Sequence, residues 1–170
     1  MKTKFPNQSN KYISVLSGLL VCAFILLCTT SNAQWTQVGA DIDGEAELDH
    51  SGQSVSLSAD GTIVAIGANY NDGINEDAGH VRVYQLISGI WIQLGEDIEG
   101  EAAYDNSGYS VSLSADGLTL AIGAHLNDEN GYNSGHVRVY KFISETWVQL
   151  GEDLDGEAQY DQSGRSIGLS

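Results

Sequence analysis

Residues 91–124 read WIQLGEDIEGEAAYDNSGYSVSLSADGLTLAIGA, and closely similar text begins 56 residues earlier at Trp35 and 56 residues later at Trp147. The copies are 35–90, 91–146 and a truncated 147–170. The stretch GHVRVY also occurs twice, at matched places in the first two copies. A fixed period of this length is typical of solenoids and propellers, so the repeat determines the expected architecture.

Each period contains four short apolar runs that are separated by turn residues. In the blade that spans residues 109–151 these runs are 110–114, 118–122, 137–142 and 147–150. The first run alternates apolar and polar residues, and Asp116-Gly117 is a hairpin signal before the second run. Residues 151–164 form a long connection to the next copy. No stretch shows helical periodicity, so the sequence predicts an all-β chain of propeller blades, each with four antiparallel strands.

The repeat resembles the FG-GAP family, whose repeat core opens with Phe-Gly and closes with Gly-Ala-Pro. The opening corresponds to Ser-Gly at 51–52, 107–108 and 163–164, and the closing to Ala-Ile-Gly-Ala at 65–68 and 121–124. Ser replaces Phe in the opening, and Asn69 or His125 stands in the place of Pro. The resemblance implies an extracellular β-propeller that is used for adhesion or ligand binding.

The number of copies is too small for a closed propeller. Only about two full blades, 53–95 and 109–151, fit within the chain together with flanking strands. A closed ring needs roughly four to eight blades. We therefore expect an incomplete ring, in which Trp35–Gly39 is a strand without a blade of its own. The remaining blades are expected from a longer chain or from self-association.

Residues 1–33 have the organisation of a signal peptide. A basic segment with three lysines precedes an apolar run, and the small-residue site Ser31-Asn32-Ala33 follows it. The alternative is a membrane anchor, but the run is short for a span of roughly 20 apolar residues. We expect cleavage after Ala33, no stable membrane insertion, and a product that is secreted or displayed on the cell surface. Both cysteines leave with the peptide, which excludes disulfides from the repeat region 34–170.

The repeat region is strongly acidic. Removal of residues 1–33 leaves four basic residues against all 23 acidic residues, a net charge of −19. Such a surface repels the phosphate backbone, so nucleic acid is not an expected partner. The simplest reason for the charge is solubility, and cation binding is the more specific alternative.

Acidic residues recur at positions 1, 3, 5 and 9 of a short segment in each copy. Calcium prefers several oxygen ligands from one flexible loop, and the spacing resembles the calcium loops of FG-GAP propellers. Two features depart from those loops, because glycine falls at position 4 and the segment precedes the repeat core. A solvated acidic loop is the alternative, and no other cofactor is expected. The candidate calcium ligands are Asp41, Asp43, Glu45, Asp49, Asp97, Glu99, Glu101, Asp105, Asp153, Asp155, Glu157 and Asp161.

Histidine and arginine also recur, in the stretch GHVRVY. Residues restated in every copy most simply serve the folding of that copy, whereas catalysis needs unlike residues that converge. We therefore predict structural roles for His80, His136, Arg82 and Arg138, and no catalytic residue. The unrepeated His50 and His125 have no metal-ligand spacing.

Positions at which the copies differ are the best candidates for specific recognition. They include Gln53, Tyr109 and Arg165 at one equivalent place, and the loops 69–78 and 125–134. We expect an exported, non-enzymatic binding or adhesion module that takes an extracellular protein or glycan. Two alternatives stay open. One is a propeller enzyme that acts on extracellular polysaccharide, and the other is a purely structural repeat array.

Overall fold

The computed structural model describes residues 34–170, and these residues form only strands, turns and loops. The predicted all-β class is confirmed. In this part of the chain, no helix has the length and apolar character that a membrane crossing requires. The predicted signal peptide, 1–33, lies outside the described residues.

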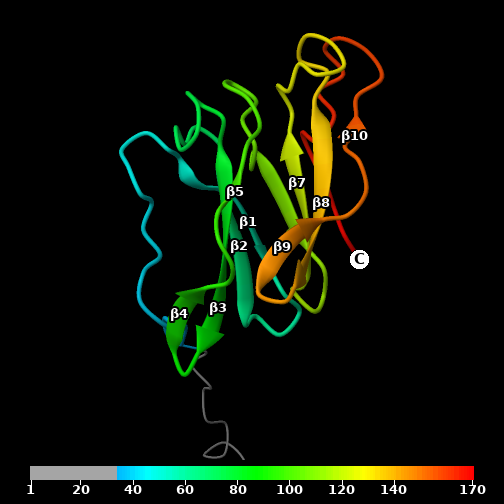
Figure 1. Cartoon of the computed structure of the whole chain (residues 1–170). Helices are drawn as coiled ribbons and strands as arrows, with labels where there is room; N and C mark the ends of the chain where they lie inside the picture. Colours follow the sequence, from blue (N-terminus) through cyan, green and yellow to red (C-terminus); the bar gives the residue numbers. More distant parts are fainter. Residues whose placement is uncertain (1–33) are drawn as a thin grey trace, which may run out of the picture. The chain divides into compact units, whose positions relative to one another are not determined.

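The strands form two antiparallel sheets that match the predicted blades (Figure 1). In each blade, four strands are paired in chain order, and a further two-residue strand pairs with the start of the third one. The first blade contains β1 (Ser51–Leu57), β2 (Ile63–Ala68), β3 (His80–Ile87), β4 (Ile90–Gln93) and β5 (Ile98–Glu99). The second blade contains β6 (Ser110–Leu113), β7 (Thr119–Ala124), β8 (His136–Ile143), β9 (Thr146–Gln149) and β10 (Leu154–Asp155).

Two details differ from the sequence prediction. The connection after the fourth strand is not a simple loop, because β5 and β10 pair with β3 and β8. The predicted strand Trp35–Gly39 is wrong, since residues 34–50 contain no strand. The corresponding residues of later copies become strands by pairing with a preceding third strand, and no such strand precedes residue 35 among the described residues.

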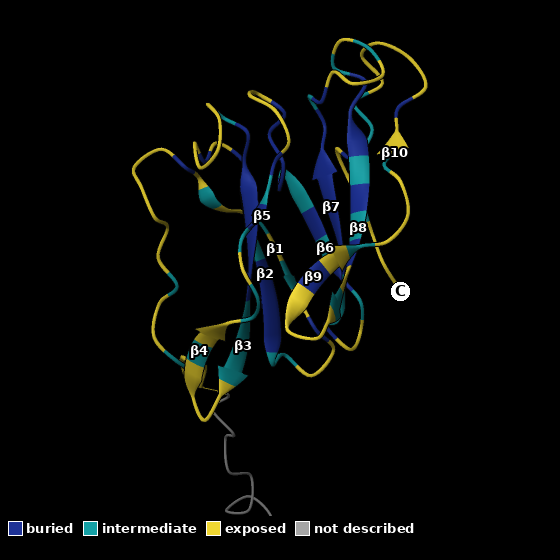
Figure 2. Ribbon diagram, viewed as in Figure 1, coloured by how far each residue is buried: buried dark blue, intermediate teal, exposed yellow. Residues whose placement is uncertain are grey.

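The two blades pack face to face, and the core lies between them. β2 and β7 are almost wholly buried (Figure 2). Val111 and Leu113 of β6 are 9% and 6% exposed because they join a cluster with residues of the first blade. Their counterparts Val55 and Leu57 are both 56% exposed. A β strand of the same sequence is therefore buried only where a preceding blade covers it.

Glycines allow the backbones of adjacent blades to approach closely. Gly67 in β2 lies against Gly108 of the next copy, and a Cβ at Gly67 would overlap the Gly108 carbonyl oxygen. The hydroxyl of Ser54 donates a hydrogen bond of 2.7 Å to that same carbonyl. One copy later, Gly123 and Gly164 repeat this contact. The opening glycine of one copy thus meets the closing glycine of the copy before it.

Polar contacts between consecutive copies also repeat along the chain. The backbone N–H of Leu113 donates to the Ser56 hydroxyl at 2.9 Å, so the inner strands of the two blades are linked directly. The Trp147 indole N–H donates to the carbonyl of Leu94 at 2.8 Å. The Trp91 indole reaches back in the same way to Val38, at 3.1 Å. The indoles of the second and third copies thus bond to the segment that opens the copy before them.

One aromatic contact within the second copy has no counterpart in the first copy. The rings of Tyr109 and His125 are in contact, with centroids 3.9 Å apart and planes tilted by 37°, whereas Gln53 and Asn69 occupy the matching positions of the first copy. His125 is buried, and its Nδ1 has no hydrogen-bond partner. Burial lowers the pKa of His125, and the positive charge of Arg165 lowers it further.

We predict that Gly67→Ala lowers the free energy of unfolding by about 1–3 kcal/mol, because the added methyl group must displace backbone of the next blade. Urea unfolding followed by circular dichroism measures this change. Gly168→Ala is the matched control, since its added Cβ meets no atom within 4 Å and is expected to change stability little. Equal stability of the two variants would contradict close blade contact at Gly67.

We predict that His125→Asn, which installs the residue of the first copy, makes the fold less sensitive to acid. Because the folded pKa lies below the ordinary value of 6.5, the folded chain binds this proton more weakly than the unfolded chain. The contribution of His125 to the free energy of unfolding of the parent chain is therefore lost as the pH falls through that lowered pKa. Thermal midpoints measured between about pH 7.5 and pH 5 should fall more steeply for the parent than for the variant. Parallel curves would refute the prediction.

Candidate functional site

The twelve predicted calcium ligands do not gather in single loops. Acidic residues of one copy instead meet residues of neighbouring copies, and the same arrangement forms at two junctions. In each junction, position 5 of one segment and position 1 of the next segment lie beside the same histidine. The histidine and the arginine of GHVRVY share one face of the third strand, because they are two residues apart.

The first junction is built around His80 at the start of β3. Its Nδ1 lies 3.6 Å from Asp97 Oδ2 and 3.9 Å from Glu45 Oε2. The other oxygen of Glu45 pairs with Arg82 at 3.3 Å, and Arg82 also donates to the Asp43 carbonyl at 3.1 Å. Burial lowers the pKa of His80, although Asp97 acts in the opposite direction.

The second junction repeats this geometry one copy later, around His136 in β8. Its Nδ1 lies 3.3 Å from Asp153 Oδ2 and 3.9 Å from Glu101 Oε2. Arg138 pairs with the other oxygen of Glu101 at 3.3 Å and donates to the Glu99 carbonyl at 2.8 Å. Burial raises the pKa of Glu101, while the guanidinium of Arg138 lowers it.

The acidic residues at position 1 share a local partner. A glutamine four residues earlier donates to one carboxylate oxygen in every copy, at 2.8, 2.5 and 2.6 Å. These pairs are Gln37 with Asp41, Gln93 with Asp97, and Gln149 with Asp153. The glutamine thus holds one oxygen, and at the two junctions the second oxygen of Asp97 and of Asp153 faces the histidine.

The acidic residues at position 9 serve the loops. Asp49 accepts a hydrogen bond from Asn71 at 2.8 Å, and Asp105 accepts one from Asn127 at 2.9 Å. Both aspartates are buried. Asp161 accepts from the backbone N–H of Ala158 at 2.8 Å, which closes its own turn. Asp49 and Asp105 thus hold the loops that follow β2 and β7, whereas Asp161 holds a turn within the connection 151–164.

The remaining candidates are less constrained. Glu99 at position 3 has a buried Oε2 without a hydrogen-bond partner, and burial raises its pKa, followed by the nearby charges of Asp97 and Glu45. Asp155 and Glu157 of the third copy are exposed. Among the described residues, no further histidine or arginine from a next copy reaches them.

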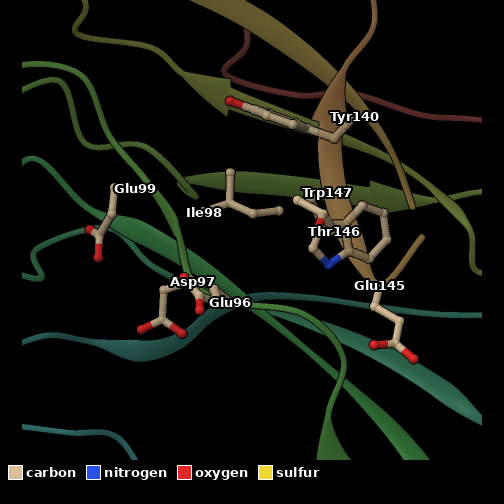
Figure 3. Close-up of a pocket in the computed structure, with 8 residues that line it drawn as sticks. All are labelled: Glu96, Asp97, Ile98, Glu99, Tyr140, Glu145, Thr146 and Trp147. Atoms are coloured by element: carbon tan, nitrogen blue, oxygen red, sulfur yellow. The ribbon is translucent and has the colours of Figure 1, made fainter. Parts of the chain in front are cut away.

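The repeat also forms a pocket beside the start of the first and of the second acidic segment. The pocket of the second copy is lined by Glu96, Asp97, Ile98, Glu99, Tyr140, Glu145, Thr146 and Trp147. Figure 3 shows Ile98 pointing toward the Trp147 indole, while the carboxylates of Asp97 and Glu99 point away from it. The matching residues of the first copy, among them Asp41, Tyr84 and Trp91, line a pocket of the same kind. Because both copies build this pocket, it follows from the repeat itself.

The junctions show what sequence reasoning missed. The sequence led us to treat the histidines and the acidic segments separately, because Glu101 precedes His136 by 35 residues and Asp153 follows it by 17. The structure brings all three together because consecutive blades are adjacent. The available signal was the period itself, since each GHVRVY lies between two acidic segments.

The comparison with known families supports the resemblance in the repeat. Residues 99–140 match the model of the FG-GAP repeat, and no curated protein matches the chain. The matched segment begins in β5 and ends in β8, so it contains both glycines Gly108 and Gly123 that contact neighbouring copies. Residues 99–140 of this chain are therefore similar to an FG-GAP repeat.

Proposed function

We propose that the chain is an exported, non-enzymatic β-propeller module that binds an extracellular protein or glycan, either secreted or at the cell surface. The observation that carries this proposal is a group of exposed tyrosines on the loops at one end of the blades. Tyr104, Tyr132 and Tyr160 are 53%, 56% and 65% exposed. Tyrosine supplies a large amphipathic surface at low conformational cost, so it is frequent in binding sites.

The tyrosines are held in place by their loops. Tyr104 and Tyr160 have φ angles of 69° and 65°, a left-handed conformation that is uncommon for such residues. The Tyr160 N–H donates to the Tyr132 carbonyl at 2.9 Å, and their rings meet edge to face with centroids 5.4 Å apart. The Tyr104 hydroxyl donates to Glu76. Strained backbone with fixed side chains is more frequent at binding sites than in ordinary loops.

The same loops are the ones in which the copies differ. The first copy has Leu48 where the others have Tyr104 and Tyr160, and Glu76 where the second copy has Tyr132. These side chains are presented from a rigid β framework, which is the usual arrangement for recognition. The acidic surface favours a neutral or basic partner rather than nucleic acid.

We also propose further blades as partners, from a longer chain or from a second copy of this one. Val55 and Leu57 form the apolar face that a preceding blade would cover, since the same face of the second blade is buried by the first. Exposed apolar sheet faces are characteristic of interaction surfaces. A second copy would place its blade there in the way that β1 and β2 pack against β6.

We predict that Tyr132→Ser combined with Tyr160→Ser reduces binding to the ligands retained on a glycan and protein array by about tenfold or more, because central tyrosines contribute roughly 2 kcal/mol or more in many interfaces. Ile143→Ser is the matched control, since Ile143 is exposed at the opposite end of β8. Equal loss in both variants, or no specific ligand for the parent, would contradict the proposed surface. Turnover of a polysaccharide would favour an enzyme instead.

We predict that calcium, if it supports the fold through the acidic segments, raises the thermal midpoint. A ligand at one hundred times its Kd contributes about 2.7 kcal/mol, which corresponds to roughly 5–10 °C in a chain of this size. Scanning calorimetry with excess calcium and with chelator measures the difference. Magnesium at equal concentration is the control for ionic strength, and equal midpoints would remove calcium from the proposal.

A further inference from the structure

We propose that the second junction is a binding site for a divalent transition-metal ion of the zinc class. Four side chains supply it: Glu101, Glu129, His136 and Asp153. One ligand atom from each lies within 4.8 Å of the others. The site goes beyond the proposed binding function, and it differs from the calcium segments because its ligands come from separate parts of the repeat and include an imidazole.

The histidine supplies evidence beyond a cluster of acidic residues. The side chain of His136 is 1% exposed, and its Nδ1 has no hydrogen-bond partner among the described residues. Buried polar atoms are almost always paired, so an unpaired nitrogen that faces carboxylates needs an explanation. A metal ion between the nitrogen and the carboxylates would provide the missing partner.

The distances suit a tetrahedral ion. Zinc bonds of about 2.0–2.1 Å place neighbouring ligand atoms about 3.3–3.4 Å apart. His136 Nδ1 is 3.3 Å from Asp153 Oδ2 and 3.9 Å from Glu101 Oε2. The first separation already has the required value, and the second needs a change of about half an ångström in an exposed glutamate.

Neighbouring groups hold the inner oxygens in place. Arg138 pairs with Oε1 of Glu101, which leaves Oε2 toward the histidine. Gln149 donates to Oδ1 of Asp153, which leaves Oδ2 toward the histidine. Outer partners of this kind orient the ligands in many metal sites. Three carboxylates and one guanidinium leave two negative charges beside the imidazole of His136, and a divalent cation balances them.

The ligand set selects the kind of ion. Calcium and magnesium prefer sites made wholly of oxygen atoms. Imidazole nitrogen combined with carboxylate oxygen suits zinc and its first-row neighbours. A hollow lined by Glu101, Ala102, Asp105, Asn127 and Glu129 opens beside the ligands and gives an ion access from solvent.

The first junction provides an internal comparison. It contains Glu45, His80 and Asp97 in the same geometry, but Gly73 stands where Glu129 stands in the second junction. The first junction therefore offers three ligands and one fewer carboxylate. Within residues 34–170, the four-ligand arrangement occurs only at the second junction. We expect the stronger site at His136.

Calorimetric titration of the full chain, after treatment with a chelator, tests the site with zinc chloride and, in a separate run, calcium chloride. The parent should bind one zinc ion strongly. His136→Asn and Glu129→Gly should each weaken that binding by at least about 10–100-fold, the loss typical even of outer-shell partners. The matched variant His80→Asn should leave it unchanged. Cobalt(II) provides a second readout, since its visible absorption band should appear in the parent and be lost in both site variants.

Glu129 lies on an exposed loop, so Glu129→Gly keeps the test informative if His136→Asn does not fold. Zinc binding that is equally strong in the parent and in Glu129→Gly would overturn the proposal. It would also be overturned by the absence of a strong zinc site, or by calcium binding at His136 with equal strength. A negative zinc result would leave the tyrosine surface unaffected, because the array measures that surface separately.

Discussion

The contact between backbone glycines of adjacent blades is the constraint on which the other features depend. Gly67 meets Gly108, and Gly123 meets Gly164, at distances that leave no room for a side chain. This approach brings the Ser54 hydroxyl within reach of the next copy. It also fixes the separation of consecutive third strands, and therefore the separation of each histidine from the acidic segments on both sides. The glycine contact thus determines both the apolar packing between the blades and the polar contacts at the histidines.

The sequence predicted the parts of the fold that depend on local patterns. Alternation from Ser110 to Leu113, with the Asp116-Gly117 turn, was sufficient for the hairpin, and the period was sufficient for the blade. Trp35–Gly39 was predicted wrongly because a strand needs a pairing partner as well as a suitable composition. The short β5 was missed because a two-residue strand has no periodicity to detect.

The junction could not be predicted from local patterns, because its members come from different copies. A regular spacing of carboxylates suggested one loop around one ion, yet the carboxylates at positions 1, 5 and 9 contact different sets of groups. Position 9 supports loops, as Asp105 does for Asn127, and position 1 is shared between a glutamine and a histidine. The repeat therefore showed that the acidic residues recur together in each copy. The groups that their side chains face depend on how adjacent copies pack, which the spacing does not encode.

The fluorescence of the tryptophans reports how closely the blades are packed. The three indoles differ in their exposure: Trp147 is buried, Trp91 is partly buried and Trp35 is fully exposed. Indole emission shifts with the polarity of its surroundings. The three fluorophores thus have three different degrees of enclosure along one chain, and separation of the blades would shift the emission of Trp147, which packs in the core cluster with residues of the first blade.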